Sequence, residues 1–206
     1  MKHWISSLLL TGIFLLCAGC AGPAAPGQEE PASLQFFAMD TVMSVTAYGE
    51  QGQTGVQAAR DAVNRLDGLL SRTDPDSQIS QLNAHAGDGT AVEVEPDVAE
   101  LLAFAQSVSQ QLPGDFDITI APVMDAWGFT TEERHVPSAE TLSAALTLVD
   151  STQLEVDGDT STARLLQAGM EVDLGAVAKG FAAGEAEEAL RAAGVERATI
   201  DLGGNV

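Results

Sequence analysis

The sequence predicts an α+β (mixed α/β) fold in which strands and helices alternate along a single domain. Segments whose apolar residues recur at steps of three and four, the period of a helix face, alternate with segments rich in β-branched and aromatic residues. Glycine, proline and aspartate separate these segments, and there is no internal repeat. With 206 residues and 45% hydrophobic content, the chain is long enough to bury one core.

The first elements are a strand and a helix. Residues 34–48 are rich in aromatic and β-branched side chains, which predicts a strand with an irregularity around Met39 and Asp40. Residues at helical spacing predict a helix after it: Val56, Ala59, Val63, Leu66 and Leu70. Asp74-Pro75-Asp76 marks a turn, and Ser77 is placed to cap the short piece that follows.

The middle of the chain predicts two more helices and a hairpin. Pro96 opens the second helix, where its missing N–H does no harm. The expected buried side of this helix consists of Val98, Leu101, Leu102, Ala105, Val108 and Leu112. A third, short helix is expected from Ser138 to about Val149. Strands at 152–156 and 163–166 are joined through Asp157-Gly158-Asp159, a hairpin signal.

The last segment predicts an extended piece, a helix and a strand. Residues 172–174 are expected to be extended, residues 179–193 to be helical with Gly194 as the stop, and residues 197–202 to form a strand. The final residues, 202–206, predict a tight turn. A domain seldom ends at such a strand, because its free edge is then left without a partner.

The N-terminus predicts an export signal with a lipid anchor. Lys2 provides the positive end, an apolar run follows, and Ala18 and Gly19 precede Cys20. This ending resembles a bacterial lipobox, in which the cysteine (here Cys20) is lipidated, although Cys17 stands where an aliphatic residue is usual. The alternative is an ordinary cleaved signal peptide, which would leave Cys20 as an odd thiol. The resulting division is a lipoprotein signal peptide (1–20), a flexible tether (21–33) and the folded domain (34–206), with the protein at the cell membrane on the extracytoplasmic side.

The charge of the chain restricts its partners. A formal net charge of −21 disfavours binding to nucleic acid or to anionic lipid. An acidic protein that handles a phosphate ester must shield it locally, with a divalent cation, a basic residue or backbone N–H groups. After Lys2 the only lysine is Lys179, which makes Lys179 a candidate for that role.

Three segments place polar residues among glycines and apolar residues, where burial without a partner would be costly. In the first, an extended 115–119 would turn Asp115, Asp117 and Thr119 to one face, suited to sugar hydroxyls, an amide edge or a metal. By itself, a solvated edge strand explains this pattern better. The third segment, Asp201 to Asn205, has paired glycines that allow close approach to a ligand, but a simple turn is the simpler interpretation.

The second segment is a strand-to-helix turn at residues 172–181. Asp173 and Lys179 bracket Gly175 where the helix begins, so free N–H groups and the positive end of the helix dipole face whatever binds there. The alternative is a capping role for Asp173 and a surface lysine that packs its stem on Phe181. Such turns are common, and the scarcity of lysine favours the functional interpretation.

In order, these segments resemble the ApbE family of FAD:protein FMN transferases, from about Phe37 to the last residue. AMDTVMSVTAYG is similar to the family's opening strand, with Asp40 where glycine is usual. LLSRTDPDSQISQLN resembles a second block, and GDFDITIAPVMDAWGF resembles the pattern F-D-x-T-x-x-P-x-x-x-x-W-G-F. VDLGAVAKGFAAGEAEEAL resembles the D-L-G-x-x-A-K-G-F/Y helix start, and DLGGN matches the next block.

The resemblance implies a flavin site and a reaction. The residues expected to line the FAD site are Met39, Asp115, Phe116, Asp117, Asp173 and Lys179. The backbone carbonyl of Ala176 would be a Mg²⁺ ligand, and Thr73 occupies the position of an aromatic residue that often stacks on the flavin. The implied chemistry is Mg²⁺-dependent transfer of FMN from FAD to a threonine hydroxyl of a target flavoprotein, with release of AMP. Extracytoplasmic redox subunits are the expected targets.

The resemblance also implies a difference in length. Family members continue for roughly a hundred further residues, a domain-sized increment that carries an Asp and a Thr of the magnesium site. The 206-residue polypeptide alone is therefore expected to be poorly stable and inactive. Two other functions are compatible with the same residues: an FAD pyrophosphatase that yields FMN and AMP, and a lipoprotein that only binds flavin nucleotide or a partner protein.

Overall fold

The computed structural model describes residues 30–131 and 133–206, and Pro31–Val206 form one compact unit. The predicted signal peptide, the predicted lipidation site Cys20 and the predicted tether up to residue 29 lie outside the described residues. The fold is mixed α/β, as predicted. No described helix is both long enough and apolar enough to cross a bilayer.

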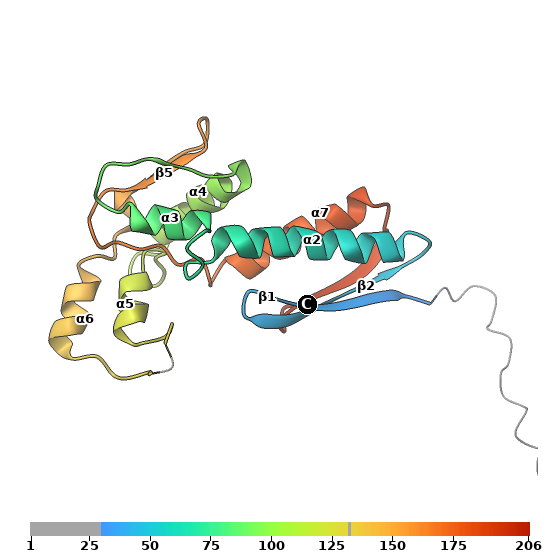
Figure 1. Ribbon diagram of the computed structural model, residues 1–206, viewed down its shortest axis with the longest axis horizontal. Coiled ribbons are helices and arrows are strands. Elements are labelled where there is room, and N and C mark those ends of the chain that lie inside the picture. Colours follow the sequence, from blue (N-terminus) through green and yellow to red (C-terminus); the bar gives the residue numbers. More distant parts are fainter. Residues whose placement is uncertain (1–29, 132) are drawn as a thin grey trace, which may run out of the picture. The chain divides into compact units, whose positions relative to one another are not determined.

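A three-stranded antiparallel sheet carries two long helices on one face (Figure 1). The strand order is β1-β2-β6, with bounds Ala32–Ala38, Thr41–Tyr48 and Arg197–Leu202. The helices are α2 (Gly52–Leu70) and α7 (Ala178–Ala192), which pack against each other. Both helices and β6 confirm the predictions within a few residues. The sheet-facing residues of β2, Met43, Val45 and Ala47, are fully buried and alternate with partly exposed ones, as expected for a sheet covered on one side.

The predicted single strand at 34–48 is wrong, because the chain turns back at its centre. Met39 (φ 47°) and Asp40 (φ 58°) lie between β1 and β2, and Ala38 pairs with Thr41. Two consecutive residues with positive φ make the tight hairpin turn whose twist matches that of the strands. Neither residue is glycine, so the left-handed conformation carries strain at this point.

A second group of elements contains the smaller sheet. Its strands are β3 (Val92–Glu93), β4 (Leu154–Asp157) and β5 (Thr162–Leu165), in the order β3-β5-β4. These strands contact α3 (Gln78–Ala84) and α4 (Pro96–Gln111), and α4 also contacts the 3₁₀ turn η1 (Ser151–Gln153). The β4–β5 hairpin confirms the prediction, whereas β3 was not predicted, because two residues carry too short a pattern.

Caps and turns set the ends of the helices in this part of the chain. Ser77 caps α3 by accepting a hydrogen bond from the Ser80 N–H at 3.0 Å, as predicted. Ser138 caps α6 (Ala139–Leu146), which ends earlier than predicted. Leu112, expected on the buried side of α4, lies beyond the helix end and is 47% exposed, and Val108 is only partly buried.

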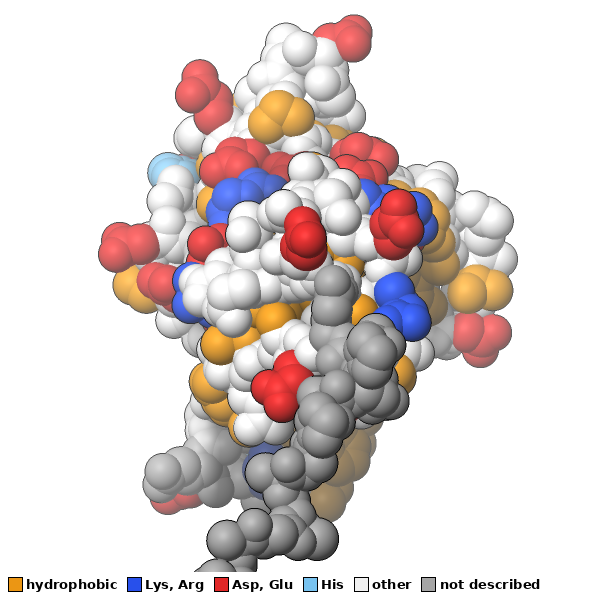
Figure 2. Space-filling model, turned by 90° about the vertical axis from the view of Figure 1, so that its right-hand side faces the viewer, with side chains coloured by type: hydrophobic (Ala, Val, Ile, Leu, Met, Phe, Trp, Pro, Cys, Tyr) orange, Lys and Arg blue, Asp and Glu red, His pale blue; other side chains and the backbone are white. Residues whose placement is uncertain are grey.

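The short helix α5 (Ala121–Ala126) was not predicted. Pro122 stands in its first turn, where proline is tolerated, and α5 contacts α6. On the face shown in Figure 2, acidic side chains are spread across the surface with fewer basic ones, consistent with the net charge of −21.

Candidate functional site

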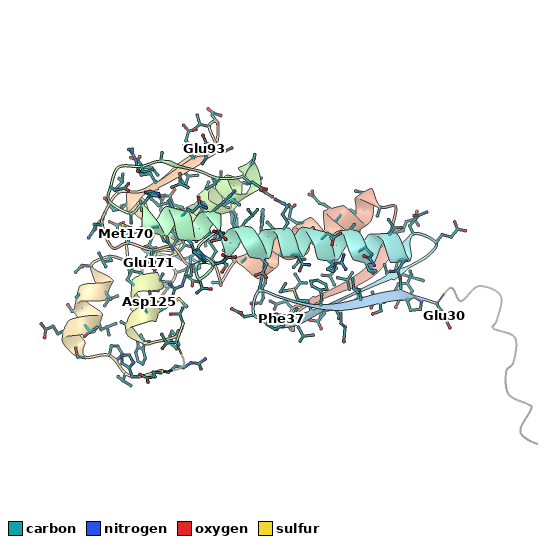
Figure 3. All side chains as sticks on the ribbon, viewed as in Figure 1. Glu30, Phe37, Glu93, Asp125, Met170 and Glu171 are labelled. Carbon is teal, nitrogen blue, oxygen red and sulfur yellow. The ribbon has the colours of Figure 1, made fainter. Side chains whose placement is uncertain are left out.

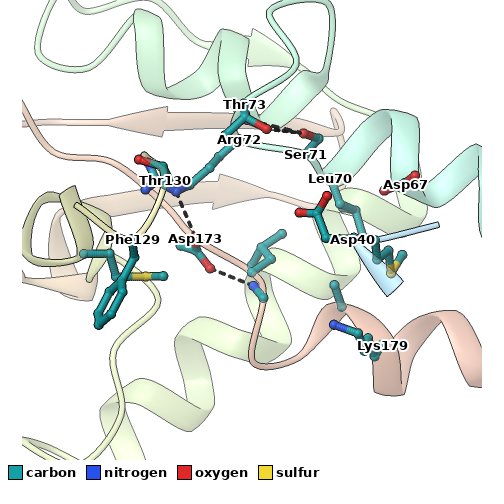
Figure 4. Close-up of a pocket in the computed structure, with 15 residues that line it drawn as sticks. Asp40, Asp67, Leu70, Ser71, Arg72, Thr73, Phe129, Thr130, Asp173 and Lys179 are labelled. Atoms are coloured by element: carbon teal, nitrogen blue, oxygen red, sulfur yellow. Dashed lines mark hydrogen bonds and ion pairs between the residues drawn. The ribbon is translucent and has the colours of Figure 1, made fainter. Parts of the chain in front are cut away.

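Two cavities flank the turn that precedes α7. The first, here called the Lys179 cavity, has a volume of about 310 Å³ and is shown in Figure 4. The second, called the Phe116 cavity, has a volume of about 510 Å³. They share Met124, Asp173 and Gly175 in their walls, so the turn at 173–175 separates two adjoining spaces.

The structure brings together all the site residues proposed from the sequence that fall in its described part. Met39, Asp173 and Lys179 line the Lys179 cavity. The residues that line the Phe116 cavity include Asp115, Phe116, Asp117, Asp173 and Ala176. Asp173 is the member common to both sets.

Hydrogen bonds fix the turn itself. The Asp173 N–H donates to the Ile118 carbonyl at 2.8 Å, and Asp173 Oδ1 accepts from the Gly175 N–H at 2.8 Å. Asp173 thus caps the turn, but it does not cap the helix, whose N-cap residue Val177 makes no side-chain hydrogen bond. Lys179 is the second residue of α7, so its ammonium group is carried at the positive end of the helix.

The Ala176 carbonyl is suited to a cation. Ala176 is exposed, and within the described residues its carbonyl oxygen accepts no hydrogen bond outside the regular helices and strands. An open carbonyl oxygen is a ligand that Mg²⁺ accepts. In the same part of the chain, no three His, Cys, Asp or Glu side chains form a group that could hold a metal by themselves. A Mg²⁺ ion at Ala176 would therefore take its other oxygen ligands from groups outside these side chains, such as a bound phosphate.

Arg72 is a feature of the site that the sequence did not indicate. Its side chain is 9% exposed and contacts Asp125, Glu171 (3.3 Å) and Asp173 (2.9 Å from Nε to Oδ2). The Nε contact is close enough for an ion pair but lacks hydrogen-bond geometry. Asp125 and Glu171 lie next to each other in Figure 3. These partners are remote in sequence, so no local pattern could have revealed the cluster.

The electrostatics of this cluster follow from burial and proximity. Burial opposes the charge on Arg72, but Asp125, Asp173 and Glu171 together raise the pKa of the guanidinium above its ordinary value. Burial, and then the charge of Asp125, raises the pKa of the Glu171 carboxyl, while Arg72 offsets part of that rise. Two basic side chains line the Lys179 cavity, Arg72 and Lys179. Arg72 is paired with carboxylates, whereas Lys179 forms no ion pair with the described residues.

The prediction that Asp115, Asp117 and Thr119 share one face of a strand is wrong. Residues 115–119 form a loop with turns and no strand, and Asp117 Oδ1 accepts from both the N–H and the hydroxyl of Thr119, at 2.8 and 2.6 Å. Asp117 Oδ2 accepts from the Ser151 N–H at 3.1 Å. Asp117 therefore holds the loop in place, whereas Asp115 is exposed and Phe116 packs partly against the core.

The glycine pair near the end of the chain lies in a turn, as the sequence predicts. Gly203 and Gly204 have positive φ, and Asp201 Oδ1 accepts from the Gly204 N–H at 2.7 Å. These glycines line neither the Lys179 cavity nor the Phe116 cavity.

Comparison with known proteins identifies a single family. The model of the ApbE family matches residues 39–206. An FAD:protein FMN transferase of Treponema pallidum is 31% identical over 205 residues, which cover 94% of this chain and 56% of the relative. One of Klebsiella pneumoniae is 35% identical over 144 residues, covering 70% of this chain and 45% of the relative. The chain thus spans about half of the length of these relatives.

Solved structures agree with the fold. The ApbE protein of Thermotoga maritima superposes with a TM-score of 0.75 at 26% identity, covering 82% of this chain and 55% of that one. The apo form of the flavinyl transferase ApbE of Pseudomonas stutzeri gives 0.75 at 25% identity, covering 87% and 58%. The flavin transferase ApbE of Vibrio cholerae gives 0.77 at 23% identity, covering 85% and 58%, which shows a common fold.

Proposed function

The chain belongs to the ApbE family, and on that premise we propose that it transfers FMN from FAD to a threonine hydroxyl of a target flavoprotein, with Mg²⁺ and with release of AMP. The relatives in Treponema pallidum and Klebsiella pneumoniae carry the name FAD:protein FMN transferase. The assignment extends that activity to this chain.

One observation carries the proposal: the turn shared by two adjoining cavities leads into the start of α7, which carries an ammonium group without an ion-pair partner among the described residues. FAD has two ring-bearing halves joined by a diphosphate. The Lys179 and Phe116 cavities could each take one half, with the diphosphate at the turn that they share. Lys179 and the start of α7 provide positive charge there, in a chain whose net charge of −21 repels anions elsewhere.

The protein contributes position and charge to the reaction. The threonine oxygen of the acceptor forms a bond to the FMN phosphorus, the bond from that phosphorus to the bridging oxygen breaks, and AMP leaves with the bridging oxygen while the hydroxyl proton is released. Lys179 binds the diphosphate and stabilises the charge that develops on the leaving phosphate. Asp173 holds the turn, and the Ala176 carbonyl would hold Mg²⁺, which supplies further charge neutralisation when bound.

We also propose that the protein acts at the cell membrane on its extracytoplasmic side, lipidated at Cys20. Support comes from the order of the N-terminal residues, a basic end followed by an apolar run and by small residues before Cys20. Metabolic labelling with a fatty-acid analogue tests this, because Cys20→Ser should abolish incorporation of the label. Labelling that persists in Cys20→Ser would contradict it.

The test of the transferase function uses the protein as its gene encodes it, including any residues that the reading frame adds after Val206. The protein is incubated with FAD and Mg²⁺, with and without a threonine-bearing acceptor flavoprotein. Covalent flavin on the acceptor is measured by mass spectrometry, and AMP by chromatography. Transfer predicts AMP release that depends on both the acceptor and Mg²⁺. AMP release without acceptor would instead identify an FAD pyrophosphatase, and FAD binding without AMP release would identify a binding protein.

Substitutions of Lys179 test its proposed role in binding the diphosphate. Lys179→Ala should lower the transfer rate by about 10- to 100-fold, the value of one hydrogen bond to a charged group. Lys179→Arg retains the positive charge and should retain part of the activity. Arg191→Ala, in which an exposed basic residue paired with Glu187 is removed from the other end of α7, should have no effect. Full activity of Lys179→Ala would refute the proposed role.

A further inference from the structure

Phe129 presents an exposed aromatic ring to the Lys179 cavity. The side chain is 52% exposed, and Phe129 is the one aromatic residue among those that line this cavity. In Figure 4 it lies across the cavity from Asp40 and Lys179. The ring is therefore accessible to anything that binds there.

The backbone turn that carries Phe129 is held by its surroundings, and the Phe129 ring lies beside a second aromatic ring. The Trp127 ring lies almost parallel to it, with 6.3 Å between the ring centroids and an angle of 8° between the planes. Between them, Gly128 has a φ of 70°, and a Cβ atom there would lie 2.5 Å from the Glu133 carbonyl oxygen, so the turn requires glycine. The Phe129 N–H donates to the Met124 carbonyl at 3.1 Å.

The same turn is tied to the floor of the cavity. The Thr130 hydroxyl donates to Asp125 Oδ1 at 3.1 Å, and Asp125 pairs with Arg72. Arg72 in turn contacts Asp173. Phe129 is thus connected, through three polar contacts, to the turn that separates the two cavities. The backbone that carries Phe129 is therefore held at the cavity wall before a ligand binds, so its position need not be ordered on binding.

Thr73, which also lines this cavity, offers no aromatic face. Its hydroxyl lies 3.2 Å from the Ser71 hydroxyl, and its N–H donates to Ser71 Oγ at 3.3 Å. Among the described residues that line the Lys179 cavity, Phe129 alone offers an aromatic face for stacking.

We infer that Phe129 is the stacking platform for a planar ring system of FAD, which binds with that ring against Phe129 and its diphosphate toward Lys179. The inference rests on the proposed function and adds a residue to its binding site. Both the flavin and the adenine are planar aromatic systems, and such rings gain affinity from offset stacking on an aromatic side chain.

Ring stacking can be separated from simple apolar contact by the choice of variants. Phe129→Leu keeps the apolar bulk without the ring, and Phe129→Tyr keeps the ring. Phe104, on α4, is 60% exposed and lines neither cavity, so Phe104→Leu is the matched control. Since both phenylalanines are exposed, the melting temperatures of all these variants should remain close to that of the wild type, which is checked first.

The experiment titrates the protein, as its gene encodes it and in Mg²⁺, with FAD, FMN and ADP, by calorimetry and by flavin fluorescence, which ring stacking quenches. Phe129→Leu should weaken FAD binding about tenfold, while Phe129→Tyr and Phe104→Leu should bind like the wild type. Weaker binding of FMN with loss of quenching would place the flavin on Phe129, and weaker binding of ADP would place the adenine there. Either result supports the inference.

Two negative results have different meanings. If the wild type binds FAD and Phe129→Leu binds FAD, FMN and ADP equally well, the inference is wrong and the proposed function stands. If the wild type binds no FAD in the presence of Mg²⁺, the proposed function itself fails, and the inference with it.

Discussion

The Nε atom of Arg72 lies 2.9 Å from Oδ2 of Asp173, which joins the loop after α2 to the turn before α7. Asp173 uses its other oxygen to hold the Gly175 N–H. The guanidinium thus stabilises the carboxylate that shapes the boundary between the two cavities.

Replacing Arg72 tests how much the cluster of Arg72 and its three carboxylates contributes to the stability of the fold. Arg72→Met should lower the free energy of unfolding by about 2 kcal/mol at neutral pH, because Asp125, Glu171 and Asp173 lose their common counter-charge. The partial exposure of Asp125 and Glu171 keeps the loss below that of a fully buried pair. Urea denaturation measures the change. Arg191→Met, whose side chain is 73% exposed, is the control and should change stability by less than about 0.5 kcal/mol. Equal effects of the two substitutions would contradict the proposed importance of the cluster.

The raised pKa of Glu171 predicts a pH dependence of stability. Its folded-state pKa lies above the ordinary value of 4.5, first because of burial and then because of Asp125. The folded state therefore binds the proton more tightly than the unfolded state, and this contribution to stability is lost as pH rises from about 4.5 through the folded pKa. Glu171→Gln has no such titration. Its free energy of unfolding relative to the wild type should rise across this window and then level off.

The measurement for Glu171 is a series of urea denaturations from about pH 4 to about pH 7 on both proteins. Only the change of the difference with pH is diagnostic, because Glu171→Gln also loses its ion pair with Arg72. A difference that falls with rising pH would show that the pKa shift has the opposite sign.

Two glycines of α2 should respond oppositely to alanine. A Cβ atom at Gly68 meets nothing within 4 Å, so Gly68→Ala should stabilise the protein by about 0.8 kcal/mol through helix propensity. A Cβ atom at Gly55 would lie 2.4 Å from Val195 Cγ2, so Gly55→Ala should destabilise it by about 1 kcal/mol or more, despite the same gain in propensity. Thermal denaturation of both variants gives the comparison. Stabilisation by Gly55→Ala would mean that α2 lies farther from Val195 than the structure has it.

The β1–β2 turn predicts a stabilising substitution at Asp40. Because Asp40 has a φ of 58°, Asp40→Gly should raise the free energy of unfolding by up to about 1 kcal/mol, by relieving the left-handed conformation. Asp40→Val should lower it by about 1 kcal/mol or more, because a β-branched residue tolerates this conformation poorly. Chemical denaturation tests both. If Asp40→Gly proves less stable than Asp40→Val, the side chain of Asp40 has a stabilising role that outweighs the strain.

Local patterns predicted the elements that have strong local signals. The apolar repeat of α2, Pro96 at the start of α4, the Ser77 cap and Gly194 after α7 each act within a few residues, so they were identified correctly. At Met39 and Asp40 the sequence predicts an irregularity but not the β1–β2 turn, since these are not the residues that usually mark a tight hairpin. The polar/apolar alternation around Asp117 predicts a strand, because the hydrogen bonds of Asp117 to Thr119 and Ser151, which make this segment a loop, leave no trace in such a pattern.

The residues of the candidate site also fall into those that local sequence patterns predict and those that only the folded structure reveals. The positions of Asp173 and Lys179 around a helix start followed from the sequence, because the helix start is a local feature. The cluster at Arg72 and the ring of Phe129 in the cavity wall did not, because each depends on residues brought together from separate segments.

By itself, the sequence determined the mixed α/β class, most of the helices, the acidic surface and the resemblance to one family, since all of these are encoded in composition or in short ordered motifs. Only the tertiary structure decided which side chains face the cavities, that Arg72 neutralises carboxylates from α5 and from the turn before α7, and that Phe129 remains accessible. The physical reason is that burial and charge pairing are properties of packed segments, and packing joins residues whose separation along the chain carries no signal.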